Sequence, residues 1–279
     1  KRDELIKEDA KAEEIIKPIL KGREIQKYTA EWTNGYIIFI PWHFPLHNKN
    51  SVVGASDEAE RKLKSVYPVL YNYLRSHKEG LSKRNKAETG IRYEWYALQR
   101  CAATYSEEFN KEKIIWKRIG SIMRFAYSDK EIYCLDSTCI ATGEKIKFLT
   151  AVLNSKAGLY QLSMTSPQTG TGDQIISVQA LEPLLVPYPD KKTETPFNRL
   201  VDYIIFLKSK ESNEKDLELK TLYFEQIIDG MVYELYFPEL LQQHNRTIIE
   251  HLGALPALED DMSDKEKMDI ITQVYDRLN

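Results

Sequence analysis

Apolar residues recur at helical spacing in several segments of the first 190 residues. Over residues 1–20 they alternate with charged residues at the spacing of a helix, which predicts one helix that ends at Gly22. A second helix is predicted from Asp57, and we expect Pro68 to kink or divide it, because proline cannot donate an interior helical hydrogen bond. A further helix is predicted over residues 148–162, and a short helix or a helical turn over residues 93–100.

Other segments of the same part are typical of strands. β-branched and aromatic residues predict strands over residues 114–116, 132–135 and 139–142. The dipeptide Asn34-Gly35 predicts a turn within a strand pair. Residues 174–189 are expected to form a strand, a brief helix and a second strand.

The pattern changes after Asp190. Helical spacing then predominates, and it predicts helices over residues 197–208, 217–236, 238–251 and 263–278. Ser263 and Glu266 form a capping box before the last of them. The sequence therefore predicts an α+β (mixed α/β) domain over residues 1–190, followed by an α-helical C-terminal region over residues 191–279.

The net charge of −3 conceals an uneven distribution along the chain. Residues 1–189 carry 28 Lys and Arg against 23 Asp and Glu, a net charge of +5, whereas residues 190–279 carry 11 against 19, a net charge of −8. Within residues 75–130 the excess is +6. This asymmetry is typical of a nucleic-acid face on one part and a solvated or partner-facing surface on the other. Scattered solvated charges are the alternative.

Cysteine usage and hydropathy bear on the compartment. Cys101, Cys134 and Cys139 form an odd, sparse set that is typical of free thiols in a reducing cytoplasm. A zinc site drawn from Cys134, Cys139, His43 and His47 is the alternative, although the C-x2-C spacing is absent. No apolar run approaches the roughly 18 residues of a membrane span, and no secretory signal is present. Because the sequence begins with lysine, we expect a fragment of a longer cytoplasmic protein.

Three patterns could indicate enzymatic chemistry. Asp190 after an apolar segment, with Glu218 and Lys220 further on, is a loose match to metal-dependent nucleases, which hold Mg²⁺ with carboxylates. The loop Thr169–Asp173 could cradle a phosphate, but it lacks the spacing of known nucleotide-binding motifs. The Asn/Asp-Pro-Pro-Tyr/Phe motif, with which amino-methyltransferases hold a flipped adenine, is absent. We therefore expect no catalytic residues, cofactor or metal in this chain itself.

Basic side chains are the remaining signal. Arginine can bind a phosphate or the edge of a guanine bidentately, and lysine mostly contacts phosphates. We expect DNA contacts from the basic residues Arg84, Lys86, Arg92, Lys117, Arg118 and Arg124, and from Thr169 and Thr171 in a loop that closes over DNA. The alternative is that Arg118 and Arg124 pair with neighbouring carboxylates. The nearby aromatic residues Trp95, Trp116 and Phe125 are expected in the core.

Six segments occur in the order found in a known family. They are IIKPILKGREIQKY (15–28), YPVLYNYLRSHKEGLSKR (67–84), YEWYALQR (93–100), KIIWKRIGSIMRFAY (113–127), LTAVLNSKAGLYQL (149–162) and QIISVQALEPLLVPYP (174–189). Together they resemble the TaqI-like C-terminal specificity domain of type IIG restriction-modification enzymes and of related phage-defence adenine methyltransferases. The resemblance spans about residues 10–190.

The resemblance implies sequence-specific recognition of double-stranded DNA. It further implies an upstream adenine methyltransferase domain of the same polypeptide, which would hold S-adenosylmethionine, and in many members a nuclease domain that needs Mg²⁺. One alternative is the specificity region of a phage-defence methyltransferase without a nuclease. Another is a protein-interaction module with no intrinsic DNA binding. Target-recognition residues vary between family members, so the resemblance does not assign base contacts to particular side chains.

Overall fold

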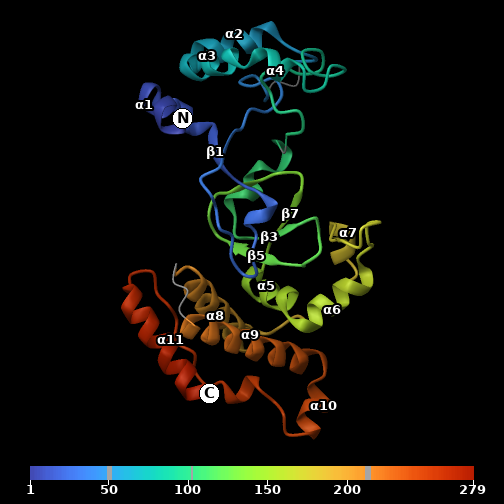
Figure 1. Ribbon diagram of the computed structural model, residues 1–279, viewed down its shortest axis with the longest axis vertical. Coiled ribbons are helices and arrows are strands. Elements are labelled where there is room, and N and C mark those ends of the chain that lie inside the picture. Colours follow the sequence, from blue (N-terminus) through green and yellow to red (C-terminus); the bar gives the residue numbers. More distant parts are fainter. Residues whose placement is uncertain (49–51, 102, 211–214) are drawn as a thin grey trace. The chain divides into compact units, whose positions relative to one another are not determined.

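The chain forms two compact units, each with its own core. The computed structural model describes residues 1–48, 52–101, 103–210 and 215–279. Unit 1 comprises Lys1–Ile19, Thr33–Asn110 and Glu131–Tyr133, and unit 2 comprises Leu20–Trp32, Lys111–Lys130 and Cys134–Asn279 (Figure 1). The chain crosses between them within β1 (Ile16–Leu20) and β6 (Tyr133–Cys134). Helices and small sheets occur together, which confirms the predicted α+β class.

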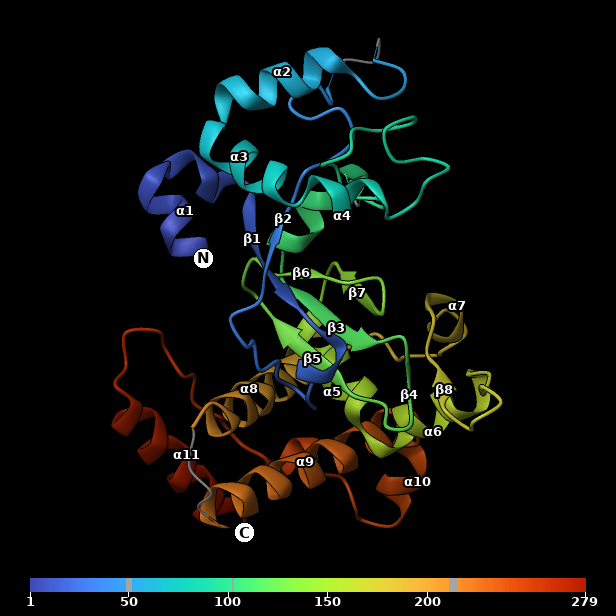
Figure 2. The ribbon, with the colours of Figure 1, turned by 45° about the horizontal axis from the view of Figure 1, so that its top comes forward.

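Unit 1 consists mainly of short helices around an aromatic core. Its elements are α1 (Arg2–Glu8), a 3-10 helix (Ala10–Glu14), β2 (Tyr36–Ile38), α2 (Asp57–Val66), α3 (Pro68–Ser76), α4 (Lys78–Ser82) and a 3-10 helix (Ala103–Asn110) (Figure 2). The predicted division at Pro68 is confirmed, because this proline is the first residue of α3. The side chain of Ser56 accepts a hydrogen bond from the Ala59 amide and caps α2.

One prediction for unit 1 is wrong. The predicted helix over residues 1–20 ends at Glu8, a 3-10 helix follows, and the last five residues form β1, which pairs antiparallel with β2. Pro18 lacks an amide hydrogen, and isoleucines at positions 15, 16 and 19 favour an extended chain. Residues 93–100, predicted as a short helix or a helical turn, form turns, in which the Ala97 amide donates to the Glu94 carbonyl at 3.0 Å.

Unit 2 is organised around a three-stranded antiparallel sheet. β3 (Lys113–Lys117) lies between β5 (Phe125–Ser128) and β7 (Thr138–Thr142), which confirms two of the three predicted strands. The third, predicted over 132–135, is reduced to β6. In the register of the sheet Trp116 lies opposite Phe125 and Cys139. Both of these aromatic side chains are buried, as the sequence predicted.

A sharp corner follows the sheet, formed by α5 (Ile146–Asn154) and α6 (Lys156–Thr165), where one continuous helix was predicted. Ser155 breaks the helix with an extended backbone, and its hydroxyl accepts a hydrogen bond from the Gly158 amide. The buried amide group of Asn154 accepts from the Phe125 amide at 3.1 Å and donates to the Phe125 carbonyl at 2.7 Å. It therefore ties α5 to β5 as a neighbouring strand would. We call residues 146–165 the α5–α6 corner.

The C-terminal helices complete the core of unit 2. They are α7 (Val178–Leu181), α8 (Lys191–Lys208), α9 (Lys215–Tyr236), α10 (Pro238–Gln243), a 3-10 helix (Ile249–His251) and α11 (Asp264–Leu278) (Figures 1 and 2). The predicted capping box of Ser263 and Glu266 is confirmed. The helix predicted over 238–251 ends at Gln243, and no second strand follows α7.

The helices after residue 190 share their core with the α5–α6 corner. Phe148 of α5, Phe197 of α8, Phe224 of α9 and Ile271 of α11 belong to one buried cluster. The compact units therefore do not separate at residue 190. The predicted boundary at residue 190, between a recognition domain and a helical spacer or docking region, stays a prediction.

Candidate nucleic-acid interface

Two predicted DNA-binding segments lie side by side in unit 2, although about fifty residues separate them along the chain. β4 (Ile119–Gly120) pairs antiparallel with β8 (Gln174–Ile175), with Ile119 opposite Ile175 (Figure 2). The Ile176 amide donates to the Arg118 carbonyl at 2.7 Å, and the Ile176 carbonyl accepts from the indole of the buried Trp116 at 2.8 Å. These bonds fix the pair of strands to the central sheet.

A second turn extends the pair into a narrow ribbon. Gln168 bridges Gln174, and the Ile175 amide donates to the Pro167 carbonyl at 2.8 Å. Residues 167–175 are therefore a hairpin whose second strand is β8. We call β4 together with this hairpin the ribbon. Because Gly120 lies opposite Gln174, the turn at residues 121–123 and the loop at residues 169–173 extend from the same end of the ribbon. We call residues 121–123 and 168–173 the ribbon end.

The loop of the ribbon end holds its shape through its own hydrogen bonds. The Thr169 amide donates to the Asp173 carbonyl at 2.8 Å, and the Gly172 amide donates to the Thr169 carbonyl at 3.0 Å. The Thr169 hydroxyl lies 2.9 Å from that of Thr171 and accepts from the Asp173 amide at 3.1 Å. Of the two predicted threonines, Thr169 is thus the one that stabilises the loop, whereas Thr171 is exposed.

Basic side chains flank the base of the ribbon. Lys117 and Arg118 are exposed, and among the described residues neither side chain has an ion pair or hydrogen bond. The Lys117 stem lies across Gly22, where an added Cβ would be 3.2 Å from Lys117 Cγ. The exposed Arg23 follows directly, in the 3-10 helix Gly22–Glu24. Sequence reasoning missed Arg23, because it lies about ninety residues before Lys117.

Arg124 is the third predicted basic residue of this unit. Its guanidinium donates to Gln26 Oε1 at 2.9 Å, and the side chain is half-buried. Neither Arg118 nor Arg124 forms an ion pair with a carboxylate in the part of the chain that the structure describes. The alternative of neighbouring carboxylate partners therefore has no support for these two residues.

The three predicted residues of unit 1 have different surroundings. Arg84 donates to the main-chain carbonyls of Leu81, Trp95 and Ala97 at 2.9, 2.9 and 2.7 Å. Arg92 forms an ion pair with Glu88 at 2.8 Å. Lys86 is exposed, without a partner among the described residues. These three residues belong to unit 1 and the ribbon belongs to unit 2, and their DNA contacts stay a prediction.

Residues 17–184 match the model of one protein family, described as the TaqI-like C-terminal specificity domain. The chain belongs to this family. The specificity domain so defined covers more than half of the chain and includes the central sheet, the α5–α6 corner and the ribbon, whereas α8–α11 lie outside it. It is a recognition domain of restriction-modification enzymes, and the family implies interaction with DNA. No curated protein matches the chain.

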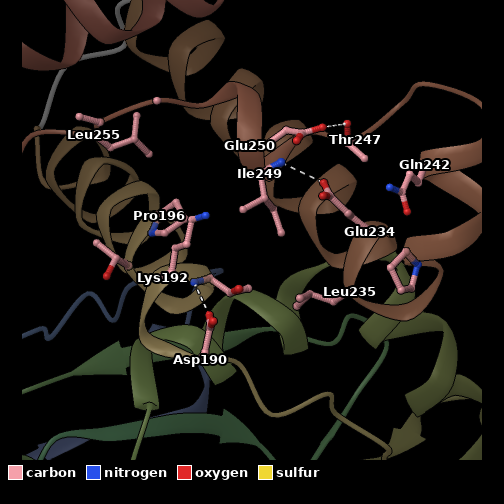
Figure 3. A pocket seen from close by; sticks show the side chains of 15 residues that line it. Asp190, Lys192, Pro196, Glu234, Leu235, Gln242, Thr247, Ile249, Glu250 and Leu255 are labelled. Atoms are coloured by element: carbon pink, nitrogen blue, oxygen red, sulfur yellow. Dashed lines mark hydrogen bonds between the residues drawn. The ribbon is translucent and has the colours of Figure 1, made fainter.

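The residues of the nuclease hypothesis do not form a site beside this specificity domain. The Asp190 carboxylate accepts from the Thr193 amide at 2.8 Å and caps α8, and this hydrogen bond lowers the pKa of Asp190 (Figure 3). Glu218 and Lys220 belong to α9, where Lys220 is buried and forms an ion pair with Asp216. Among the described residues, no group of three or more His, Cys, Asp or Glu side chains could hold a metal ion.

Asp190 also lies at the edge of an open hollow of about 1040 Å³ in the helical part of unit 2 (Figure 3). Leu235, Ile249 and Leu255 give it apolar walls. The Glu234 carboxylate accepts from the amide of Ile249 at 2.9 Å, so this acid stabilises the adjoining turn.

The residues of the zinc hypothesis do not form a metal-binding group in the described part of the chain either. Cys134 and Cys139 belong to unit 2, whereas His43 and His47 belong to unit 1. Burial raises the pKa of the Cys134 thiol to about 11. His43 Nδ1 lies 3.1 Å from the buried Glu94 carboxylate, which also accepts from the His43 amide.

No helix in the described part of the chain is long and apolar enough to cross a membrane.

Proposed function

We propose that this chain is the sequence-specific DNA-recognition module of a type IIG restriction-modification enzyme. The observation that carries the proposal is the pair of exposed basic side chains, Lys117 and Arg118, at the base of the ribbon. An unpaired surface cation loses no internal interaction when it approaches a phosphate, and it releases counterions from the DNA. Arg23, on the neighbouring turn, adds a third positive charge.

The partners of the module follow from the family. We propose that an upstream adenine methyltransferase domain of the same cytoplasmic polypeptide binds S-adenosylmethionine and flips an adenine, while this chain holds the duplex in register. A nuclease domain that uses Mg²⁺ would act from the same polypeptide. Supporting this division, the chain lacks the motif that grips a flipped adenine and has no metal-binding group among its described residues.

The proposal is tested by fluorescence anisotropy of the chain with a mixed-sequence duplex, titrated from low to moderate salt. We expect log affinity to fall linearly with log salt concentration, because phosphate contacts displace counterions. The double variant Lys117→Gln/Arg118→Gln should weaken binding about tenfold and reduce the salt slope by about two. Its melting temperature should equal that of the parent, since neither side chain has an internal partner.

A matched control removes two positive charges elsewhere in unit 2. Lys191 and Lys192 are exposed on the first turn of α8. The variant Lys191→Gln/Lys192→Gln has the same net charge as the test variant, so equal loss of affinity in both would indicate a general charge effect and contradict the placement of the DNA face. Absence of salt-sensitive binding by the parent would instead favour the protein-interaction alternative.

A further inference from the structure

The ribbon end differs in charge from the base of the ribbon, where Lys117 and Arg118 form what we call the basic flank. Its exposed side chains are neutral: Ser121, Ile122, Gln168 and Thr171, with 62% of Ile122 accessible to solvent. The one charged residue there is Asp173, a half-buried acid that would repel a phosphate. The ribbon end therefore offers neutral side chains to the DNA, whereas Lys117 and Arg118, a few residues away, offer positive charge to the phosphates.

The two-stranded architecture of the ribbon is one that a groove of the duplex can accommodate. The major groove of B-DNA admits a two-stranded β-ribbon, and there each base pair presents a distinct pattern of donors, acceptors and methyl groups. The paired strands β4 and β8 form such a ribbon, and the turn at residues 121–123 and the loop at residues 169–173 lie at its end. With phosphates bound by Lys117 and Arg118, the ribbon end is the part that extends beyond the backbone contacts.

Two side chains of the ribbon end carry groups that match the edges of A·T base pairs. The Gln168 side chain is exposed and has no partner among the described residues, so its amide can donate to N7 and accept from the N6 amino group of adenine. Ile122 offers an apolar surface for a thymine methyl group, the contact that an exposed aliphatic side chain can make in the major groove. The internal hydrogen bonds of the loop hold its backbone before DNA binds, which reduces the entropy lost on binding.

We infer that the ribbon end is the element that determines sequence specificity, with Gln168 contacting an adenine edge in the major groove and Ile122 packing on a thymine methyl group. This inference rests on the proposed function, because it requires the flank to hold the duplex. It assigns a role to two residues that are not basic. The basic residues around them supply affinity for any sequence.

The experiment selects bound duplexes from a randomised DNA pool with the full chain and sequences them. We expect the parent to enrich a sequence that contains A·T pairs. Gln168→Ala should reduce the preference at one position by about tenfold, the discrimination that one bidentate base contact provides. Ile122→Ala should relax a second position. The salt slope for mixed-sequence DNA should stay unchanged, since neither variant removes a phosphate contact.

The control is Gln226→Ala, which removes an exposed glutamine from α9 of the same unit and should leave the enriched sequence unchanged. If Gln168→Ala and Ile122→Ala enrich the parental sequence with parental preference, the inference is wrong and the proposed function stands. Salt-sensitive binding by the parent without any enriched sequence would also overturn the inference, because the ribbon end would then make no base contacts. Absence of all DNA binding would overturn the proposed function itself.

Discussion

The α5–α6 corner and the ribbon belong to the same unit and differ in how their polar groups are used. In the corner, Asn154 and Ser155 are buried and bond to neighbouring main-chain atoms. In the ribbon and at its base, the Gln168, Lys117 and Arg118 side chains face solvent without a partner among the described residues. Residues of the corner are fixed by the fold, whereas residues of the ribbon can change without leaving a buried polar atom unpaired.

This difference explains which residues carry the family resemblance. The segment LTAVLNSKAGLYQL stands out in the sequence because its Asn, Ser and Gly have structural roles that few other residues can fill. A recognition surface has no such requirement, since each target demands different contacts. The resemblance therefore identifies the scaffold, and the contacts have to be inferred from geometry.

The largest effect is expected from Gly158→Ala, which tests whether the corner is as tightly closed as described. A Cβ on Gly158 would lie 2.0 Å from the Val152 carbonyl oxygen, so the backbone of the corner would have to move. We expect a loss of more than about 3 kcal/mol, visible as a fall of about 10 °C in melting temperature. The same change at Gly170 in the ribbon end meets no atom within 4 Å and should have little effect. Equal effects at the two glycines would contradict the comparison.

A smaller effect is expected from Asn154→Ala. The variant leaves the buried Phe125 amide without the Asn154 oxygen that it donates to, and α5 loses its tie to β5. Each unpaired buried group costs about 1–3 kcal/mol, so we expect a loss of about 3 kcal/mol in chemical denaturation. Gln168→Ala serves as the control from the ribbon and should not change stability. A stable Asn154→Ala variant would mean that water replaces the amide.

The smallest effects extend the comparison to unit 1. Arg84→Ala leaves the carbonyls of Trp95 and Ala97 without their donor, and we expect a loss of about 2 kcal/mol. Lys86→Ala, two residues away, should change stability by less than about 0.5 kcal/mol. Thermal melts of both variants and anisotropy with DNA separate the two roles. A variant Arg84→Ala of parental stability and reduced DNA affinity would show that this arginine belongs to the interface.

Much of the fold could be predicted from local patterns. The C-terminal helices, the capping box at Ser263 and the division at Pro68 follow from periodicity and from the chemistry of single residues. The errors arise where tertiary contacts override spacing. Residues 16–20 have helical spacing, but they pair with β2, and the pairing partner lies beyond a connection that periodicity does not reveal.

The candidate site could be predicted only in part. The sequence identifies Lys117, Arg118 and the loop with Thr171, but not that β4 and β8 place them on one ribbon. Charge counting also cannot distinguish the exposed Arg118 from Arg84, whose donors are taken by main-chain carbonyls. Arg23 and Gln168 carry no local signal at all. They gain significance only from their neighbours in space.

The shortness of the β4–β8 pairing has a consequence for how such enzymes acquire new targets. Only two residue pairs form this ladder. The next residue, Ile176, anchors it through main-chain hydrogen bonds to the Arg118 carbonyl and the Trp116 indole, and these residues lie outside the two loops. Substitutions, insertions or exchange of about a dozen residues at 121–123 and 167–173 would leave that anchor intact. If the ribbon end determines specificity as inferred above, transplanting these two short loops would change the target, a smaller evolutionary step than replacing a whole domain.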